Sequence, residues 1–152
     1  MSEQSLVLIK PDGVQRLLVG RIVARFEDKG LKLTGLKLVR VSREFAEQHY
    51  AVHKDRPFFA GLVEFITSSP LVAIAVSGPN AISVVRSMVG ATRPWEATAG
   101  TIRGDFGVVV AQNLIHASDG PETAAAELAL WFPEGTLDYA REVDRWVLSP
   151  EG

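Results

Sequence analysis

Apolar residues fall into short runs and helical stripes that alternate along the chain. Apolar or alternating residues at 6–9, 33–41 and 71–76 predict three strands. The run at 71–76 is apolar at every position, which is typical of a strand buried on both faces. A shorter apolar run at 108–110 predicts a fourth strand.

Helical spacing marks the segments between the predicted strands. Apolar residues recur every three or four positions over 19–29, and Gly30 follows where a helix C-cap is expected. Ser42 suits the N-cap of a helix that runs toward Tyr50. Similar stripes predict further helices at 59–66, 81–88 and 121–132.

The order of these elements indicates the fold class. Strand, helix, strand, helices, strand, helix, strand, helix is the alternation of an α/β sandwich, in which we expect helices to cover one face of a sheet of about four strands. The order of the strands within the sheet does not follow from the pattern. The stretch 89–106 and the tail after the last helix are expected to be mostly irregular. A structureless stretch as long as 89–106 is uncommon in a compact domain and indicates a functional loop.

Composition narrows the class of protein. The chain has 152 residues, of which 47% are hydrophobic and 22% charged, so we expect one globular domain over 1–152. It has no cysteine, no targeting segment and no apolar run near the roughly 20 residues of a membrane helix, so we expect a cytoplasmic protein without disulfides. A net charge of −2 is unlike the basic balance of proteins that coat nucleic acid, although a few local cations can still bind a small anion.

The densest group of polar residues is at 113–122, between the predicted fourth strand and the last helix. His116 is a candidate phosphoryl acceptor, because a neutral imidazole with an ordinary pKa of about 6.5 is a nucleophile near neutral pH. Glu127 shares a helix face with apolar residues, so its carboxylate is expected to point inward. A buried carboxylate needs a partner, which His116 or Ser118 could supply.

The start of the last helix is expected to favour an anion. Asp119 and Glu122 have the spacing of a capping pair, and Pro121 is tolerated in a first helical turn. Free backbone N–H groups beside His116 would attract negative charge. Taken alone, however, His116 is more simply explained as an ordinary loop histidine, Glu127 as a charge at a helix edge and Asp119 as a cap.

Several residues elsewhere have the chemistry that a nucleotide requires. Lys10, Arg86 and Arg103 are the charges expected around a triphosphate, and Phe58 could stack on a base. Each also has a simpler explanation. Lys10 could be a solvated strand-end residue, Arg86 and Arg103 surface cations, and Phe58 a core aromatic.

Together, these segments resemble the nucleoside diphosphate kinase family. Residues 113–119, with the pattern N-x-x-H-A-S-D, match the active-site signature of that family. Further matches follow in the family's order at 9–14 (IKPDGV), 49–50 (HY), 56–59 (RPFF), 100–106 (GTIRGDF) and 130–132 (LWF). A match of several independent segments, in the family's order and through nearly the whole chain, is not explained by chance.

The resemblance implies a phosphotransferase. His116 would take a phosphoryl group from a nucleoside triphosphate, typically ATP, and pass it to a nucleoside diphosphate. Glu127 and Ser118 would orient His116, and Lys10 would reach the sugar hydroxyl and the transferring phosphate. The other implied nucleotide contacts are Tyr50 beside Lys10, Arg86, Thr92 and Arg103 on the phosphates, Asn113 on the ribose and Phe58 on the base.

The resemblance also implies a ferredoxin-like sandwich with a four-stranded antiparallel sheet. A homo-oligomer is expected, as a hexamer rather than a tetramer. Mg²⁺ would arrive on the nucleotide phosphates, with no protein cage of its own. Because stacking on Phe58 does not distinguish one base from another, we expect broad tolerance of base and sugar. We expect neither membrane association nor stable binding of nucleic acid.

One loop departs from the family pattern. Ala99 stands where relatives usually have proline, and Trp95 is bulky for this position. The family uses this loop in subunit contacts, and losing a proline increases the conformational freedom of the chain. The segment 93–99 is therefore expected to affect assembly and stability rather than chemistry.

Two other classes of function stay open from the residues alone. A nucleic-acid-binding sandwich would display bases on an open sheet, but the strands predicted at 6–9 and 108–110 have no aromatic pair for stacking. An inactive scaffold would keep the fold without the chemistry. The presence of His116, Lys10 and Asn113, together with Arg103, argues against a scaffold.

Overall fold

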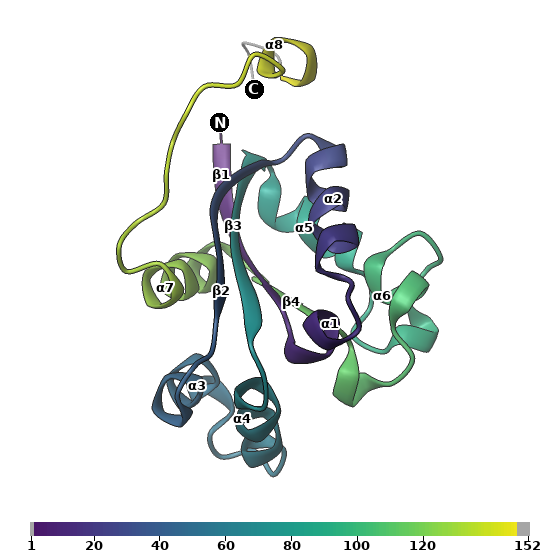
Figure 1. Cartoon of the computed structure of the whole chain (residues 1–152), viewed down its shortest axis with the longest axis vertical. Helices are drawn as coiled ribbons and strands as arrows, with labels where there is room; N and C mark the ends of the chain where they lie inside the picture. The colour runs from purple at the N-terminus through teal and green to yellow at the C-terminus, as the bar shows by residue number, and fades with distance from the viewer. Residues whose placement is uncertain (1, 149–152) are drawn as a thin grey trace.

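The computed structural model describes residues 2–148 and contains one antiparallel sheet (Figure 1). Its strands are β1 (Ser2–Ile9), β2 (Lys32–Val39), β3 (Leu71–Pro79) and β4 (Ile115–Ala117). They lie in the order β2-β3-β1-β4, so β1 and β3 are central and β2 and β4 are edges. All three pairings are antiparallel. The sheet confirms the predicted ferredoxin-like sandwich with four antiparallel strands.

The fourth strand is not the one that the apolar run at 108–110 predicts. Val108, Val109 and Val110 are 71%, 46% and 40% exposed, and within residues 2–148 they pair with no strand. β4 forms a few residues later and pairs with β1. The prediction at 108–110 is wrong because β-branched residues favour an extended backbone only where a sheet neighbour is available. His116 consequently lies in a strand and not in a loop.

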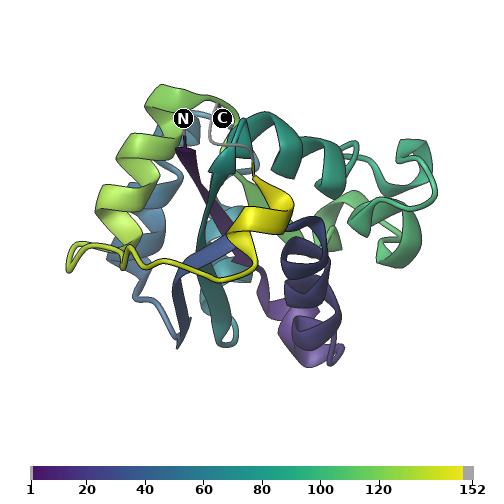
Figure 2. The same cartoon turned by 90° about the horizontal axis from the view of Figure 1, so that it is seen from above.

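Helices cover both faces of the sheet, where the sequence pattern predicts one face (Figure 2). Val7 and Ile9 join one hydrophobic core while Leu6 and Leu8 join the other, because successive strand residues point to opposite faces. One face packs against α2 (Val19–Lys29), α5 (Ala81–Val89) and α6 (Ile102–Phe106), and the other against α3 (Arg43–His49), α4 (Phe59–Thr67) and α7 (Pro121–Trp131). Four consecutive apolar residues in β1 are the sequence signal for this arrangement.

Local sequence sets the ends of several helices. α2 ends at Gly30, whose φ of 97° lies in the left-handed region, as predicted. α3 begins after Ser42, whose hydroxyl accepts a hydrogen bond from the N–H three residues on. The start of α7 differs from the prediction. Its N-cap is Gly120 without a side-chain cap bond, so Asp119 and Glu122 do not form the expected capping pair.

Short helices also form outside the segments with helical spacing. α1 (Pro11–Gln15) follows β1 directly. The stretch 89–106 includes a 3-10 turn, η2 (Pro94–Glu96), and α6, which begins after Thr101 with a hydrogen bond of 3.0 Å from the Gly104 N–H to the threonine hydroxyl. Two further 3-10 turns are η1 (Ala51–His53) and η3 (Val110–Gln112).

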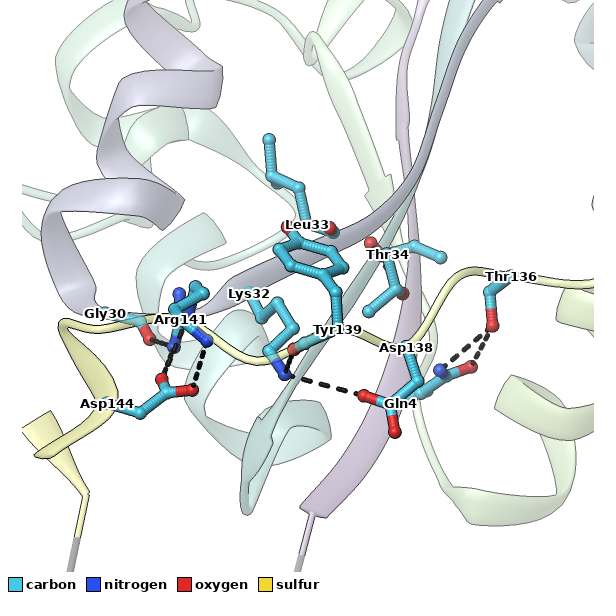
Figure 3. Close-up of polar contacts among 11 residues, drawn as sticks. Gln4, Gly30, Lys32, Leu33, Thr34, Thr136, Asp138, Tyr139, Arg141 and Asp144 are labelled. Carbon is cyan, nitrogen blue, oxygen red and sulfur yellow. Dashed lines mark hydrogen bonds and ion pairs between the residues drawn. The ribbon is translucent and has the colours of Figure 1, made fainter.

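The tail, residues 133–147, follows α7 and runs beside the start of β2 (Figures 1 and 3). The Tyr139 hydroxyl donates to the backbone carbonyl of Leu33 at 2.6 Å, and the Arg141 guanidinium donates to that of Gly30 at 3.0 Å. The tail is irregular as predicted, except for its end, which forms α8 (Asp144–Val147). These contacts connect the tail to β2 and to the C-cap of α2.

Candidate active site

His116 is placed by the alternation of β4. It lies opposite Leu8 of β1, while its neighbours Ile115 and Ala117 are buried in the core on the other face of the sheet. Because side chains alternate along a strand, burying these two neighbours directs His116 toward the face that α3 and α7 cover. The side chain is 24% exposed, so a substrate can reach it.

Glu127 forms the expected contacts, with His116 on one carboxylate oxygen and Ser118 on the other. Glu127 Oε2 lies 2.8 Å from His116 Nε2, and Ser118 Oγ donates to Glu127 Oε1 at 2.7 Å. Ser118 Oγ also accepts the backbone N–H of Leu6 at 3.2 Å, so the hydroxyl is fixed by β1. With Nε2 facing a carboxylate, Nε2 carries the hydrogen and Nδ1 keeps its lone pair.

The electrostatics of Glu127 favour its charged form. Burial raises the pKa of the carboxyl, but the hydrogen bonds from His116 and Ser118 bring it below the ordinary value. Glu127 is therefore ionised at neutral pH and accepts from both partners.

Lys10 and Asn113 meet beside the histidine strand. Lys10 Nζ donates to Asn113 Oδ1 at 3.0 Å, and the Lys10 backbone N–H donates to the Leu114 carbonyl at 2.8 Å. Asn113 Nδ2 in turn donates to the carbonyl of Thr92 at 3.1 Å. Asn113 thus connects two of the residues predicted to bind nucleotide, while Thr92 itself is exposed.

Arg103 is buried and holds the backbone around the site. Its three guanidinium nitrogens donate to the carbonyls of Asn113 at 3.2 Å, Gly90 at 3.2 Å and Ile115 at 2.6 Å. Arg86 is exposed and donates to the Ala117 carbonyl at 3.2 Å. Both cations are therefore attached to the segment that carries His116.

Burial also changes the acidity of the cations. It lowers the pKa of Lys10 to about 8, with a further decrease from the charge of Arg103 and an opposing effect from Asp12. Burial and the charge of Arg86 lower the pKa of Arg103 to about 10. Within residues 2–148 neither Lys10 nor Arg103 forms an ion pair, and such clustered positive charge favours an anionic ligand.

Tyr50 and Phe58 lie toward α3 and α4. Tyr50 is buried, and its ring is 4.7 Å from that of His49. Phe58 is 50% exposed beside His53, with ring centroids 5.4 Å apart, so it is not the core aromatic of the simpler explanation. Its exposed face is free to stack on a base.

Sequence reasoning left two residues beside His116 without a role. The ring of His49 is 4.9 Å from that of His116, and Trp131 Nε1 donates to His49 Nδ1 at 3.0 Å. His49 lies within a matched segment, and Trp131 shares a helix face with Glu127. Their contact joins residues 82 positions apart, which no local pattern indicates.

A family model described as nucleoside diphosphate kinase matches residues 3–137. The chain belongs to the nucleoside diphosphate kinase family. A nucleoside diphosphate kinase from Symbiobacterium thermophilum is 56% identical over 150 residues, which cover 99% of each chain. One from Picosynechococcus is 63% identical over 135 residues, covering 89% of this chain and 91% of the relative.

Solved structures of nucleoside diphosphate kinases share the fold. A halophilic enzyme from Halobacterium salinarum in complex with CDP has a TM-score of 0.95 and 46% identity, over 98% of this chain and all of that one. A family member from Babesia bovis has a TM-score of 0.93 and 48% identity, over 96% and 99% of the two chains.

Membership of the nucleoside diphosphate kinase family decides between the classes of function. The chain is a phosphotransferase of nucleotide metabolism that binds nucleotides. The alternatives of a nucleic-acid-binding module and an inactive scaffold are set aside. Within residues 2–148, no helix combines the length and apolar character that crossing a membrane requires.

Proposed function

We propose that this enzyme moves the terminal phosphoryl group of a nucleoside triphosphate, typically ATP, to a nucleoside diphosphate through a phosphohistidine at His116. The observation that carries the proposal is the contact of His116 Nε2 with Glu127 at 2.8 Å. This contact leaves the Nδ1 lone pair available, on a side chain that is 24% exposed. A neutral imidazole in that tautomer is a nucleophile at neutral pH.

The reaction occurs in two balanced halves. First, the lone pair on His116 Nδ1 forms a bond to the terminal phosphorus, while the bond from phosphorus to the bridging oxygen breaks and its electron pair stays on the departing diphosphate. In the second half, a terminal oxygen of another diphosphate attacks the phosphorus and the P–N electron pair returns to Nδ1. Glu127 accepts the Nε2–H throughout and balances the positive charge that develops on the ring.

The surrounding cations stabilise the charge on the transferring group. Lys10 is held beside the His116 strand by Asn113 at 3.0 Å, and Arg103 by three backbone carbonyls. Charges fixed before substrate binds need little reorganisation during the reaction, which is how electrostatic catalysis is most effective. Arg86 uses one N–H on the Ala117 carbonyl and can direct others toward a phosphate, with the exposed Thr92 hydroxyl.

The nucleoside would lie along the rim of the site. Phe58 would stack on the base, Asn113 and Lys10 would meet the ribose, and Tyr50 would support Lys10 from the buried side. Stacking on an aromatic ring is tolerant of base identity, which supports broad use of bases and sugars.

Magnesium is proposed to enter as part of the nucleotide substrate. Mg²⁺ prefers oxygen ligands, but the residues gathered around His116 are mainly cations and nitrogen donors. Glu127, the carboxylate among them, already accepts from His116 and Ser118. The nucleotide phosphates would therefore hold the ion, which neutralises part of their charge.

We also propose that the enzyme is a homo-oligomer, with six chains rather than four. β2 is an edge strand, and it presents Leu36 and Leu38 at 55% and 66% exposure. Apolar side chains on a free strand edge are typical of a contact surface.

Initial-rate kinetics test the phosphohistidine. Varying ATP at several fixed concentrations of dTDP should give parallel double-reciprocal lines, because the first product leaves before the second substrate reacts. Intersecting lines would mean direct transfer between two bound nucleotides and would contradict an intermediate on His116. Repeating the measurement with purine and pyrimidine donors tests the broad tolerance of bases.

A further inference from the structure

Trp131 fixes the tautomer of His49. The indole Nε1–H donates to His49 Nδ1 at 3.0 Å, and Trp131 is only 2% exposed, so water cannot replace this bond. An indole nitrogen is a donor only, so Nδ1 of His49 must carry a lone pair. A neutral imidazole with an unprotonated Nδ1 has its hydrogen on Nε2.

One helix orients both histidines of the site. Glu127 and Trp131 are four residues apart on α7 and therefore lie on the same helix face. Glu127 holds His116 through Nε2, and Trp131 holds His49 through Nδ1. The two imidazole rings meet edge to face, with centroids 4.9 Å apart and an interplanar angle of 82°. The ring of His49 thus forms one wall of the space in which His116 can rotate.

A cation site is the other reading of this cluster. His49, His116 and Glu127 each offer an atom within 4.8 Å of the others, a spacing that a metal ion could bridge. However, the Nδ1 lone pair of His49 is occupied by Trp131, and its Nε2 carries a hydrogen. Lys10 and Arg103 add positive charge nearby. The donor set therefore does not suit a cation.

The surroundings also keep His49 uncharged. Burial lowers the pKa of His49 to about 3, and the charges of His116, Lys10 and His53 act in the same direction, while Glu127 opposes them. Among the other groups, Tyr50 contacts His49 and is neutral, because burial and the charge of Glu127 raise its pKa to about 12. An imidazolium at this position would lower the basicity of His116, the property on which its nucleophilicity depends.

We propose that His49, held by Trp131 as the neutral Nε2–H tautomer, is a positioning residue for His116. The ring of His49 keeps His116 in the orientation in which Nε2 meets Glu127 and Nδ1 faces the substrate. Burial, together with the bond from Trp131, keeps His49 from accepting a proton beside the nucleophile. The inference rests on the proposed phosphorylation of His116. It adds that a second histidine, His49, sets the orientation of the His116 ring.

The wild-type enzyme provides the first test. In ¹⁵N-edited NMR of the imidazole side chains, His49 should show the Nε2–H pattern, and this pattern should persist as pH falls through the ordinary histidine pKa of about 6.5. An Nδ1–H pattern, or protonation of His49 near that pH, would overturn the proposal. This result does not depend on activity, so it is distinct from a failure of the phosphohistidine mechanism.

Variants then test the role in the reaction. Trp131→Phe removes the donor and replaces the indole with a smaller ring, which should admit water beside His49. The burial that lowers the pKa of His49 is then weaker, so His49 becomes able to take a proton. The acidic fall in the rate of His116 phosphorylation should then move to higher pH by about one unit, comparable to the spread of histidine pKa values in folded proteins. Adding His49→Phe to Trp131→Phe should cancel that movement, because no imidazole is left to protonate.

A matched substitution controls for the loss of an indole. Trp146 is 77% exposed on α8, and Trp146→Phe should leave the pH profile unchanged. An unchanged profile for Trp131→Phe, in a variant that folds, would overturn the proposal. So would a movement that the added His49→Phe does not cancel. If Trp131→Phe does not fold, the NMR result on the wild-type enzyme decides.

Discussion

At the scale of single residues, the site is organised by hydrogen bonds that fix which nitrogen or oxygen is free. His116 Nε2 is engaged by Glu127, and Glu127 is in turn held by Ser118. These bonds engage Nε2 of His116 and both carboxylate oxygens of Glu127, so Nδ1 is the ring nitrogen of His116 whose lone pair stays available. The geometry that the proposed nucleophilic catalysis requires is therefore built before a nucleotide binds.

The protonation state of Lys10 should make the activity depend on pH. Its pKa, lowered by burial to about 8, lies below the ordinary value of 10.5, so the ammonium loses its proton as pH rises through about 8. We expect kcat/KM to fall over the same range, because the charge that faces the phosphates is lost. Bound phosphates raise the pKa of the amine, so kcat should fall only at higher pH.

Rate profiles against pH, measured for both kinetic parameters, check this prediction. Lys10→Arg serves as the control, because a guanidinium stays charged across this range and should remove the alkaline fall. A wild-type kcat/KM that stays flat through pH 8, or the same fall in Lys10→Arg, would contradict the role of the lysine.

The contacts of Glu127 were predictable from the sequence. Sequence reasoning placed Glu127 inward from its helix face and suggested His116 or Ser118 as its partner, and the structure contains both contacts. The Trp131–His49 bond was not predictable, because nothing in either local pattern indicates that α7 and α3 meet at these atoms. Phe58 shows the same limit, since its exposure depends on what packs above it.

At the scale of elements, apolar runs predict strands well only when the run is long enough to be buried. The run at 71–76 became the buried core of β3, but the run at 108–110 stayed exposed. β4 has three residues, one of them His116, and exists because β1 offers it a pairing edge. Such a strand depends on a long-range contact that a local pattern does not contain.

Two glycines, Gly20 within α2 and Gly30 at its C-cap, offer a paired test of how a glycine contributes to stability. Gly30 has a φ of 97°, and a Cβ built there would lie 2.6 Å from Cγ1 of Val147 in α8. We expect Gly30→Ala to lower the free energy of unfolding by more than about 1 kcal/mol, through left-handed strain and displacement of the tail. Thermal or denaturant unfolding measures the change.

Gly20 is the matched control within the same helix. A Cβ at this position meets no atom within 4 Å, so Gly20→Ala should raise the free energy of unfolding by about 0.5–1 kcal/mol through helix propensity. Equal effects of the two substitutions would show that neither the backbone conformation of Gly30 nor its contact with α8 matters.

At the scale of the whole molecule, two cores on opposite faces of one sheet hold the site between β4, α3 and α7. The tail contacts β2 at the Leu33 carbonyl and through an ion pair between Glu134 and Lys37 at 2.9 Å. Leu36 and Leu38, farther along this edge strand, stay exposed, as does Trp95 in the loop that departs from the family pattern. These surfaces have the character of contacts between subunits.

Sedimentation measures the assembly that these surfaces predict. We expect a single species of six chains, and Leu38→Glu should dissociate it because a charge would then lie on the exposed face of β2. A monomeric wild-type enzyme would contradict assembly altogether, and a four-chain species would contradict the hexamer. A Leu38→Glu variant that sediments like wild type would exclude this face of β2 from the contact.

The central claim is that His116 carries the phosphoryl group between nucleotides. Intact mass spectrometry, after brief exposure of the enzyme to magnesium-ATP at neutral pH, tests it most directly. We expect a mass gain of one phosphoryl group that disappears when GDP is added, with GTP as the product, and no gain in His116→Ala. A wild-type enzyme that gains no mass, or a gain that persists in His116→Ala, would contradict the account.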